Sequence, residues 1–235
     1  AGGGKFTFYN LQFVVCCYFG NNWLMSCRFL LIFLVVSKKK RNFAVTNIKC
    51  KNMKENIYDI KMVARYIALS LLTKQMTVSP LKLQKLLYYA QAWSMVFFGR
   101  QRQLFADVPQ AWVNGPVYPT IYNMWKNRNM CEHLTPADFE TTEDVMDEAL
   151  GEVTKQLGLG DDEIQLLEQI VLKYGSKSQN YLIFLTHSEL PWCEKREGLK
   201  PFERSVNPLS LDTMYSYYAE RHAKNVERRK SMVTA

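Results

Sequence analysis

The segment from Ser79 to Gly99 constrains the fold of this chain more than any other, because it has the pattern of one long helix with both ends marked. Ser79 is a typical N-cap residue, Pro80 suits the first helical position, where its missing N–H is not needed, and Gly99 is typical of a helix end. One face of this helix of about 18 residues is apolar and is expected to build the core. That face consists of Leu83, Leu86, Leu87, Ala90, Trp93 and Phe97.

A second stripe lies along the same helix, about a third of a turn from the apolar face. Polar and apolar side chains alternate in it: Gln84, Tyr88, Gln91 and Met95. Such a mixture fits a hydrated surface, a packing seam or a contact site for a partner. The residues of the stripe leave these three interpretations open.

The rest of the pattern predicts a mainly α fold. Helical spacing runs through residues 57–72 and 161–174, and Asp161 is expected to be the N-cap of the second of these helices. Ser210 is expected to cap a last helix, and the acidic residues 135–157 are expected to be mostly helical and solvated. We therefore expect a single compact multi-helix domain.

Residues 103–119 interrupt the helical pattern. They contain three prolines, an Asn-Gly-Pro turn and the β-like stretch Ala111–Val113. This predicts a short irregular or β-like segment, followed by another helix after Pro119.

The net charge of +8 is concentrated at the N-terminal end. Residues 1–52 hold eight Lys or Arg side chains and no acid, so the remaining residues hold 22 basic and 22 acidic side chains. A body without a basic surplus lacks the charge that would hold phosphates, and no nucleic-acid partner is expected. Two lone cysteines, Cys131 and Cys193, fit a reducing, cytoplasmic setting better than a disulfide framework.

Residues 1–52 are expected to be an extension outside the folded domain. The apolar run from Trp23 to Val36 is shorter than the roughly 20 residues that cross a bilayer, is interrupted by Arg28, and is followed by a basic cluster. The open interpretations are spurious translation ahead of Met53 and a membrane anchor, so a membrane contact is expected only if this segment inserts. At the other end, residues 226–235 read as a basic, frayed tail.

The string from Thr186 to Glu189 places a His beside a Ser and an acid, as a nucleophilic site would. No glycine elbow surrounds Ser188, and catalytic triads are assembled in space rather than in sequence. We expect instead that Ser188 caps a helix whose first turn holds Pro191, with a partner surface as the second interpretation. Cys193 is expected to be a buried, inert thiol, and His133, His187 and His222 lack metal-ligand spacing. We therefore predict no catalytic, cofactor-binding or metal-binding residues.

Four strings in a fixed order resemble the Panacea domain, the SocA-like antitoxin domain that is also met in proteins called phage-associated. They are KLQKLLYYAQAW (residues 82–93), LF (104–105), AWVNGPVYPTIY (111–122) and THSELPWCEKREG (186–198). The resemblance covers roughly residues 53–225.

This resemblance implies an antitoxin of a toxin–antitoxin system, which neutralises a cognate protein toxin by direct binding and is not an enzyme. Two alternatives stay open. One is a proteolytic adaptor that delivers a toxin to an AAA+ protease of the ClpXP type, and the other is a protein-binding or regulatory module of phage origin that is not an antitoxin.

Polar and aromatic members of the matched strings are our candidates for a shared partner-binding surface. They are Gln84, Tyr88, Gln91, Asn114, His187, Glu189 and Trp192. Tyr and Trp are enriched in interface hot spots, which favours this hypothesis. The rival hypothesis is that these residues bond to one another inside the fold and that the toxin binds elsewhere, for example on the acidic segment.

Overall fold

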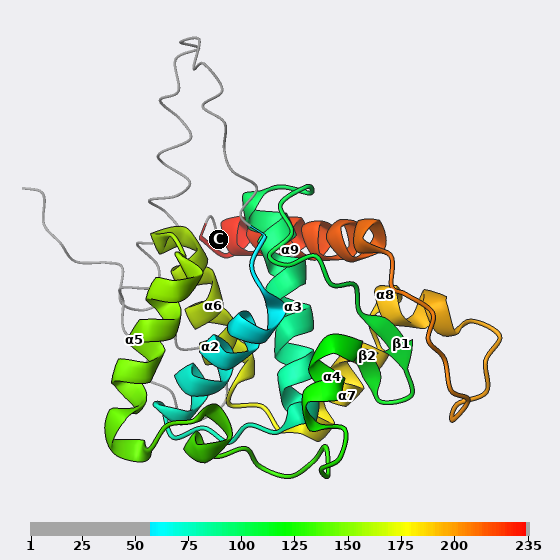
Figure 1. The fold of residues 1–235 in the computed structure, drawn as a ribbon. Coiled ribbons are helices and arrows are strands. Elements are labelled where there is room, and N and C mark those ends of the chain that lie inside the picture. The colour runs from blue at the N-terminus through cyan, green and yellow to red at the C-terminus, as the bar shows by residue number, and fades with distance from the viewer. Residues whose placement is uncertain (1–56, 234–235) are drawn as a thin grey trace, which may run out of the picture. The chain divides into compact units, whose positions relative to one another are not determined.

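The computed structural model describes residues 57–233, and it confirms the mainly α fold class (Figure 1). Within this range the α-helices are α2 (Ile60–Leu72), α3 (Pro80–Phe98), α4 (Pro119–Trp125), α5 (Met146–Leu157), α6 (Asp161–Tyr174), α7 (Gln179–His187), α8 (Leu190–Cys193) and α9 (Leu211–Val233). Two short strands, β1 (Gln110–Trp112) and β2 (Gly115–Val117), and three 3-10 turns, η2 (Pro136–Phe139), η3 (Glu143–Val145) and η4 (Glu194–Arg196), complete the elements.

The chain divides into a body, residues 55–227, and a second unit to which residues 1–54 and 228–235 belong. The hypotheses for residues 1–52 lie outside the described residues. Between residues 57 and 233, no helix combines the length and the apolar character that a bilayer crossing requires.

Helix α3 is the central element of the body, and α2, α4, α6, α7 and strand β2 all pack against it (Figure 1). Its start is as predicted, because the Ser79 hydroxyl accepts a hydrogen bond from the Lys82 amide and Pro80 occupies the first turn. Every residue from Pro80 to Met95 is buried. A helix enclosed by neighbours on all sides has no solvent face, so even its polar positions lie in the interior.

Two expectations about α3 are settled by this enclosure. The second stripe of Gln84, Tyr88, Gln91 and Met95 is a packing seam, since all four side chains are buried. The expected core position of Phe97 is wrong: its side chain is 43% exposed in the last turn of α3, where its ring contacts only part of the fold, including Trp93 and His222.

Three predicted helix ends differ by one or more residues. Gly160, not Asp161, is the N-cap of α6, and Asp161 begins the first turn, where its negative charge favours the helix dipole. Ser188 is the C-cap of α7, and Glu189 is the N-cap of α8, with Pro191 in the first turn as expected. The basic tail is not frayed from residue 226, since α9 continues to Val233.

The predicted β-like segment is a two-stranded antiparallel hairpin in which Gln110 pairs with Val117 and Trp112 with Gly115. The outer edge of β1 is also occupied, because the Ala111 amide donates to the Asn207 carbonyl. Both edges of β1 are therefore satisfied, which removes the open strand edge that a partner could extend.

Candidate partner-binding surface

Two buried glutamines on α3 fix the loops on either side of the hairpin. The Gln84 amide accepts from the Tyr118 backbone N–H (2.7 Å) and donates to the Tyr118 carbonyl (3.3 Å). Two turns further along α3, the Gln91 Oε1 accepts a hydrogen bond from the Leu104 amide (2.8 Å), while its Nε2 donates to the Phe105 carbonyl (2.9 Å). A primary amide can serve a backbone donor and a backbone acceptor at once. Both side chains therefore take the place of a strand partner for extended backbone that would otherwise be unpaired in the interior.

Two buried lysines on α3 also bond to backbone groups of neighbouring segments. The Lys82 ammonium donates to the carbonyls of Thr77 and Gly175 (both 2.6 Å), and burial lowers its pKa. Lys85 is fully buried and donates to the Pro116 carbonyl (2.9 Å), and loss of hydration lowers its pKa to about 7. Lys85 therefore lies close to the point at which the neutral and charged amine are equally populated in neutral solution.

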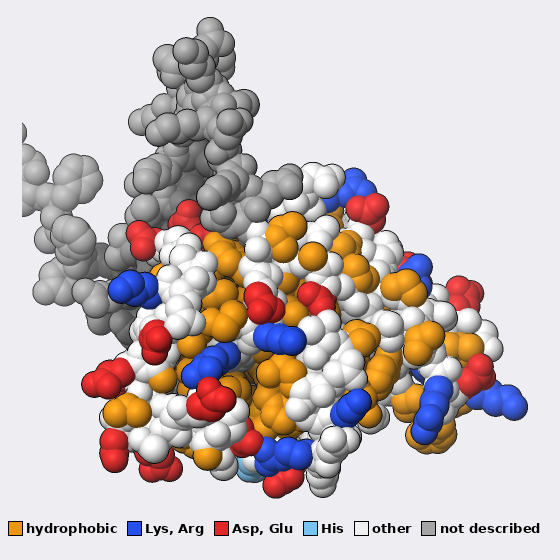
Figure 2. Space-filling model, in the orientation of Figure 1, with side chains coloured by type: hydrophobic (Ala, Val, Ile, Leu, Met, Phe, Trp, Pro, Cys, Tyr) orange, Lys and Arg blue, Asp and Glu red, His pale blue; other side chains and the backbone are white. Residues whose placement is uncertain are grey.

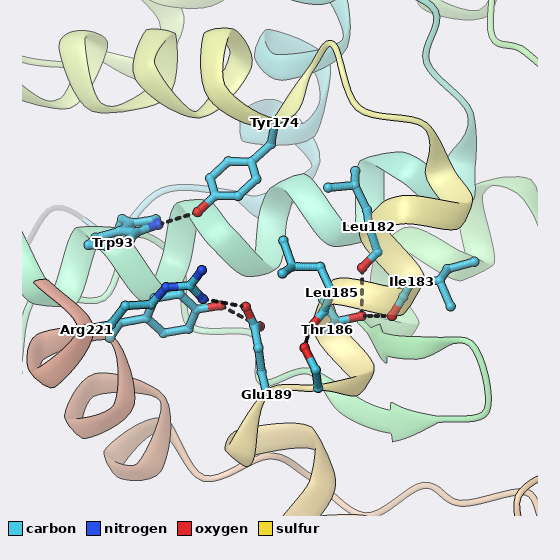
Figure 3. Close-up of polar contacts among 10 residues, drawn as sticks. Trp93, Tyr174, Leu182, Ile183, Leu185, Thr186, Glu189 and Arg221 are labelled. Atoms are coloured by element: carbon cyan, nitrogen blue, oxygen red, sulfur yellow. Dashed lines mark hydrogen bonds and ion pairs between the residues drawn. The ribbon is translucent and has the colours of Figure 1, made fainter. Parts of the chain in front are cut away.

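A buried carboxylate joins the start of α8 to α9. Glu189 accepts a hydrogen bond from the Tyr218 hydroxyl (2.6 Å) and forms an ion pair with the Arg221 guanidinium (3.2 Å). Figure 3 shows Glu189 and Arg221 facing each other from these two elements, with Trp93 bonded to Tyr174 beside them. Burial raises the pKa of Glu189 to about 7, and the hydrogen bond from Tyr218 and the positive charge of Arg221 oppose that rise.

Aromatic packing surrounds this carboxylate. Tyr89 stacks on Tyr174 with ring centroids 4.0 Å apart, and Tyr218 meets the edges of Tyr88 and Trp93. Arranged in this way, the rings of α3, α6 and α9 bury a large apolar area. The cluster fixes α9 on the body and leaves Tyr88 without exposed area.

Next to the buried cluster, a stacked pair of rings reaches the surface. The His187 imidazole lies flat on the Trp192 indole, with centroids 4.0 Å apart and planes 12° apart. The Trp192 Nε1–H donates to the Trp112 carbonyl (2.9 Å), and the Arg196 guanidinium lies over the same indole at 5.2 Å. The pKa of His187 is lowered by burial and by the Lys85 and Arg196 charges, so the ring is expected to be neutral in neutral solution.

Exposed apolar side chains continue outward from this stack. Phe184, one turn before His187 on α7, is 70% exposed, and Leu190 at the start of α8 is 52% exposed. Tyr181 precedes Phe184 by another turn and is also exposed. We call this the α7–α8 surface: Trp112, Asn114, Tyr181, Phe184, His187, Leu190 and Trp192.

The structure separates the seven candidate residues into two groups. Asn114 is exposed in the hairpin turn, and His187 and Trp192 are half-buried on the α7–α8 surface. The remaining four, Gln84, Tyr88, Gln91 and Glu189, are buried, so the expected common surface is not formed by all seven. The reason is the enclosure of α3, together with the inward turn of the Glu189 side chain toward α9. A role in partner binding stays a prediction for every one of them.

Sequence reasoning missed Phe184 and Leu190 because it weighed THSELPW as a polar string. The sequence carried little signal, because residues 181–185 are all apolar or aromatic and periodicity does not show which of them face the core. In the structure Leu182 and Thr186 are buried, and Phe184, midway between them on α7, falls on the opposite face. Tyr218 and Arg221, the partners of Glu189, had no sequence signal, since they are 29 and 32 residues away.

Two kinds of reactive group would bear on the chemistry of this surface, a metal cluster and the Cys193 thiol. Among residues 57–233 no group of His, Cys, Asp and Glu side chains could hold a metal ion. The expectation of a buried Cys193 is wrong: the residue is exposed, and its thiol donates to the His187 carbonyl (3.1 Å). Partial desolvation raises the pKa of this thiol although the residue is exposed, which disfavours the nucleophilic thiolate.

Residues 83–193 match the family model of the antitoxin SocA-like, Panacea domain. This segment of the chain is therefore similar to the SocA-like Panacea family. The match begins in the first turn of α3 and ends with α8, so it contains all seven candidates and the whole α7–α8 surface. Helix α9, with Tyr218 and Arg221, follows the matched Panacea segment. Comparisons with curated proteins and with solved structures gave no match.

Proposed function

We propose that this protein is the antitoxin of a toxin–antitoxin system and neutralises a cognate protein toxin by direct, non-enzymatic binding. The observation that carries the proposal is the match of residues 83–193 to a family whose description is an antitoxin domain. A toxin is accordingly the expected partner, and the cytoplasm the expected compartment.

The α7–α8 surface is the contact site that the geometry favours. It offers an exposed phenyl and an exposed leucine, Phe184 and Leu190, beside the rigid His187–Trp192 stack. Large apolar side chains on a preorganised frame lose little entropy on binding, which is the character of interface hot spots. Gln84, Gln91 and Lys85 of α3 contribute indirectly, since they hold the hairpin and its flanking loops, and Trp192 is bonded to that hairpin.

The test is growth rescue by the full chain coexpressed with the small protein encoded beside it, together with copurification of the two. Phe184→Glu and Leu190→Glu are expected to abolish both, because each places a charge in the centre of the contact. Leu172→Glu is the matched control, since Leu172 is a comparably exposed leucine (42%) on α6. Circular dichroism checks that all three variants are folded.

The rival contact site is tested in the same assay. Asp147 lies in the first turn of α5 and is exposed, so Asp147→Lys alters the acidic segment without disturbing the core. Full rescue by Asp147→Lys alongside failure of Phe184→Glu supports the α7–α8 surface. The reverse pattern overturns that surface as the contact site and moves it to the acidic segment.

Toxin half-life distinguishes direct neutralisation from delivery to a protease. Direct neutralisation leaves the half-life unchanged or lengthened, whether or not a ClpXP-type protease is present. A half-life that the antitoxin shortens only when the protease is present overturns direct neutralisation in favour of the adaptor mechanism. Failure to recover any complex, with no rescue, overturns the antitoxin proposal.

A further inference from the structure

A cleft with a volume of about 230 Å³ lies between α2, α4 and η2. Figure 2 shows the face that carries α2 and α4, where hydrophobic side chains are visible between charged ones. The lining residues are Lys61, Met62, Arg65, Met124, Asp138, Phe139 and Glu140. None of them belongs to the α7–α8 surface, and the antitoxin proposal makes no use of the cleft.

The cationic side of the cleft is incompletely satisfied. The Arg65 Nη2 donates to the Phe139 carbonyl (2.7 Å), which fixes the guanidinium at the wall of the cleft, and Arg65 makes no ion pair with any described residue. Lys61 is exposed, and its ammonium makes no ion pair with any described residue. Two cations one turn apart on α2, Lys61 and Arg65, therefore line the cleft together.

The anionic side is largely occupied. Asp138 forms an ion pair with Arg128 and also accepts from the Thr135 amide (2.7 Å) in a capping box. Its charge is therefore neutralised within the fold. Glu140 is exposed at the rim, where it ends η2 in a left-handed conformation. The cleft therefore has one unpaired carboxylate, Glu140, and two cations, Lys61 and Arg65, so a ligand with one negative charge would balance it.

The floor is apolar and adaptable. Phe139 is buried, Met62 is half-buried, and Met124 is 44% exposed. Methionine thioethers adjust their shape to a bound group and recur at surfaces that accept peptides. The floor is therefore suited to one aliphatic or aromatic side chain.

The volume limits the occupant. Sites for cofactors and drug-sized ligands span about 300–1,000 Å³, so a cleft of this size holds about one amino-acid residue. That residue has to supply a large apolar group and a carboxylate together. No standard side chain carries both, whereas an apolar residue at the C-terminus of a chain does.

We propose that this cleft binds the C-terminal residue of a protein partner, with its apolar side chain on Met62, Met124 and Phe139 and its α-carboxylate between Lys61 and Arg65. Carboxylate capture by a guanidinium and an ammonium is charge-assisted on both sides. The floor selects an apolar last residue, and the two cations select a free terminus over an internal peptide segment.

The test uses the full chain carrying ¹³C-methyl methionine and two probes, acetyl-Leu-Leu with a free carboxylate and the same dipeptide as its C-terminal amide. We expect the acid to shift the Met62 and Met124 methyl signals with a dissociation constant on the order of 1 mM. The amide is expected to bind at least about tenfold more weakly, as loss of a charge-assisted contact implies. The signal of Met95, which lies in the core, is the internal reference and should not move.

Variants locate the carboxylate. Lys61→Gln is expected to weaken binding of the acid about five- to tenfold without affecting the amide. Lys155→Gln removes an exposed lysine on a different helix, α5, and should change the affinity for neither the acid nor the amide. The proposal is overturned if acid and amide bind equally, if Lys61→Gln has no effect, or if the Met62 and Met124 signals do not respond to the acid. These results are independent of the growth-rescue assay.

Discussion

Glu189, the N-cap of α8, accepts a hydrogen bond of 2.6 Å from the hydroxyl of Tyr218 on α9. The residues on either side of Glu189 have exposed side chains, while its own carboxylate points inward and is buried. One backbone position thus connects the α7–α8 surface to the buried aromatic cluster. Because Arg221 shares the same carboxylate, α9 is tied to the segment that carries Trp192.

The first prediction concerns the pH dependence that Glu189 imposes on stability. Its pKa in the fold, about 7, exceeds the usual value of 4.5, so the folded state holds this proton more tightly than the unfolded chain does. The free energy of unfolding should therefore fall as pH rises from 4.5 to 7, by on the order of 3 kcal/mol. In Glu189→Gln this contribution is absent. Urea unfolding followed by circular dichroism measures both profiles, and parallel curves would contradict the prediction.

Lys85 should act in the opposite direction at higher pH. Its pKa is lowered from 10.5 to about 7 by burial, so the folded state favours the neutral amine. The free energy of unfolding should rise between pH 7 and pH 10.5, by on the order of 5 kcal/mol. Lys85→Met removes this rise. Comparison with wild type isolates the contribution of Lys85, because the tyrosines titrate equally in both proteins; a rise retained in Lys85→Met would show that other groups cause it.

Gln91→Leu tests the role of the buried amide. The substitution preserves size but leaves the Leu104 amide and the Phe105 carbonyl without partners in the interior. We expect a loss of about 2–4 kcal/mol in the free energy of unfolding. Gln165→Leu on the exposed face of α6 is the control and should change stability by less than about 0.5 kcal/mol. Equal effects of the two variants would mean that the loop backbone finds other partners.

A pair of glycine substitutions should shift stability in opposite directions. Gly115 has a φ of +93°, and an added Cβ would lie 2.7 Å from the Thr186 Oγ1 and 2.9 Å from the Lys85 Nζ. Gly115→Ala is therefore expected to destabilise the protein by more than about 2 kcal/mol. Gly151 lies in the middle of α5 with open space around it, so Gly151→Ala should stabilise the protein by about 0.5–1 kcal/mol. Melting temperatures of the two variants that shift in the same direction would contradict this account.

Local signals were sufficient to predict most of the secondary structure. Ser79 and Pro80 begin α3, Ser210 caps α9 through the Thr213 amide, and the Asn-Gly-Pro sequence forms the turn of the hairpin. Each of these depends on backbone groups a few residues away, so the sequence contains the information in one place. The misplaced ends, at Asp161 and Ser188, have N-caps, Gly160 and Glu189, that make no side-chain cap hydrogen bond, so no capping side chain marks them in the sequence.

The candidate site was less predictable, because exposure is a property of the whole fold. Gln84 and Gln91 have the composition of a surface stripe, and nothing within α3 indicates that the hairpin loops cover it. The partners of these two amides lie 34 and 13 residues further along the chain. A polar side chain can be buried wherever a distant segment supplies its hydrogen bonds, and periodicity within one helix does not report that segment.

The sequence by itself determined that this chain is mainly helical, where its long central helix begins and ends, and which family its motifs resemble. Only the tertiary structure decided which motif residues are accessible: Trp192 and His187 form a stacked pair at the surface, while Tyr88 and Glu189 are enclosed by α9. The physical reason is that helix formation follows from interactions between near neighbours, whereas burial follows from the packing of elements far apart along the chain.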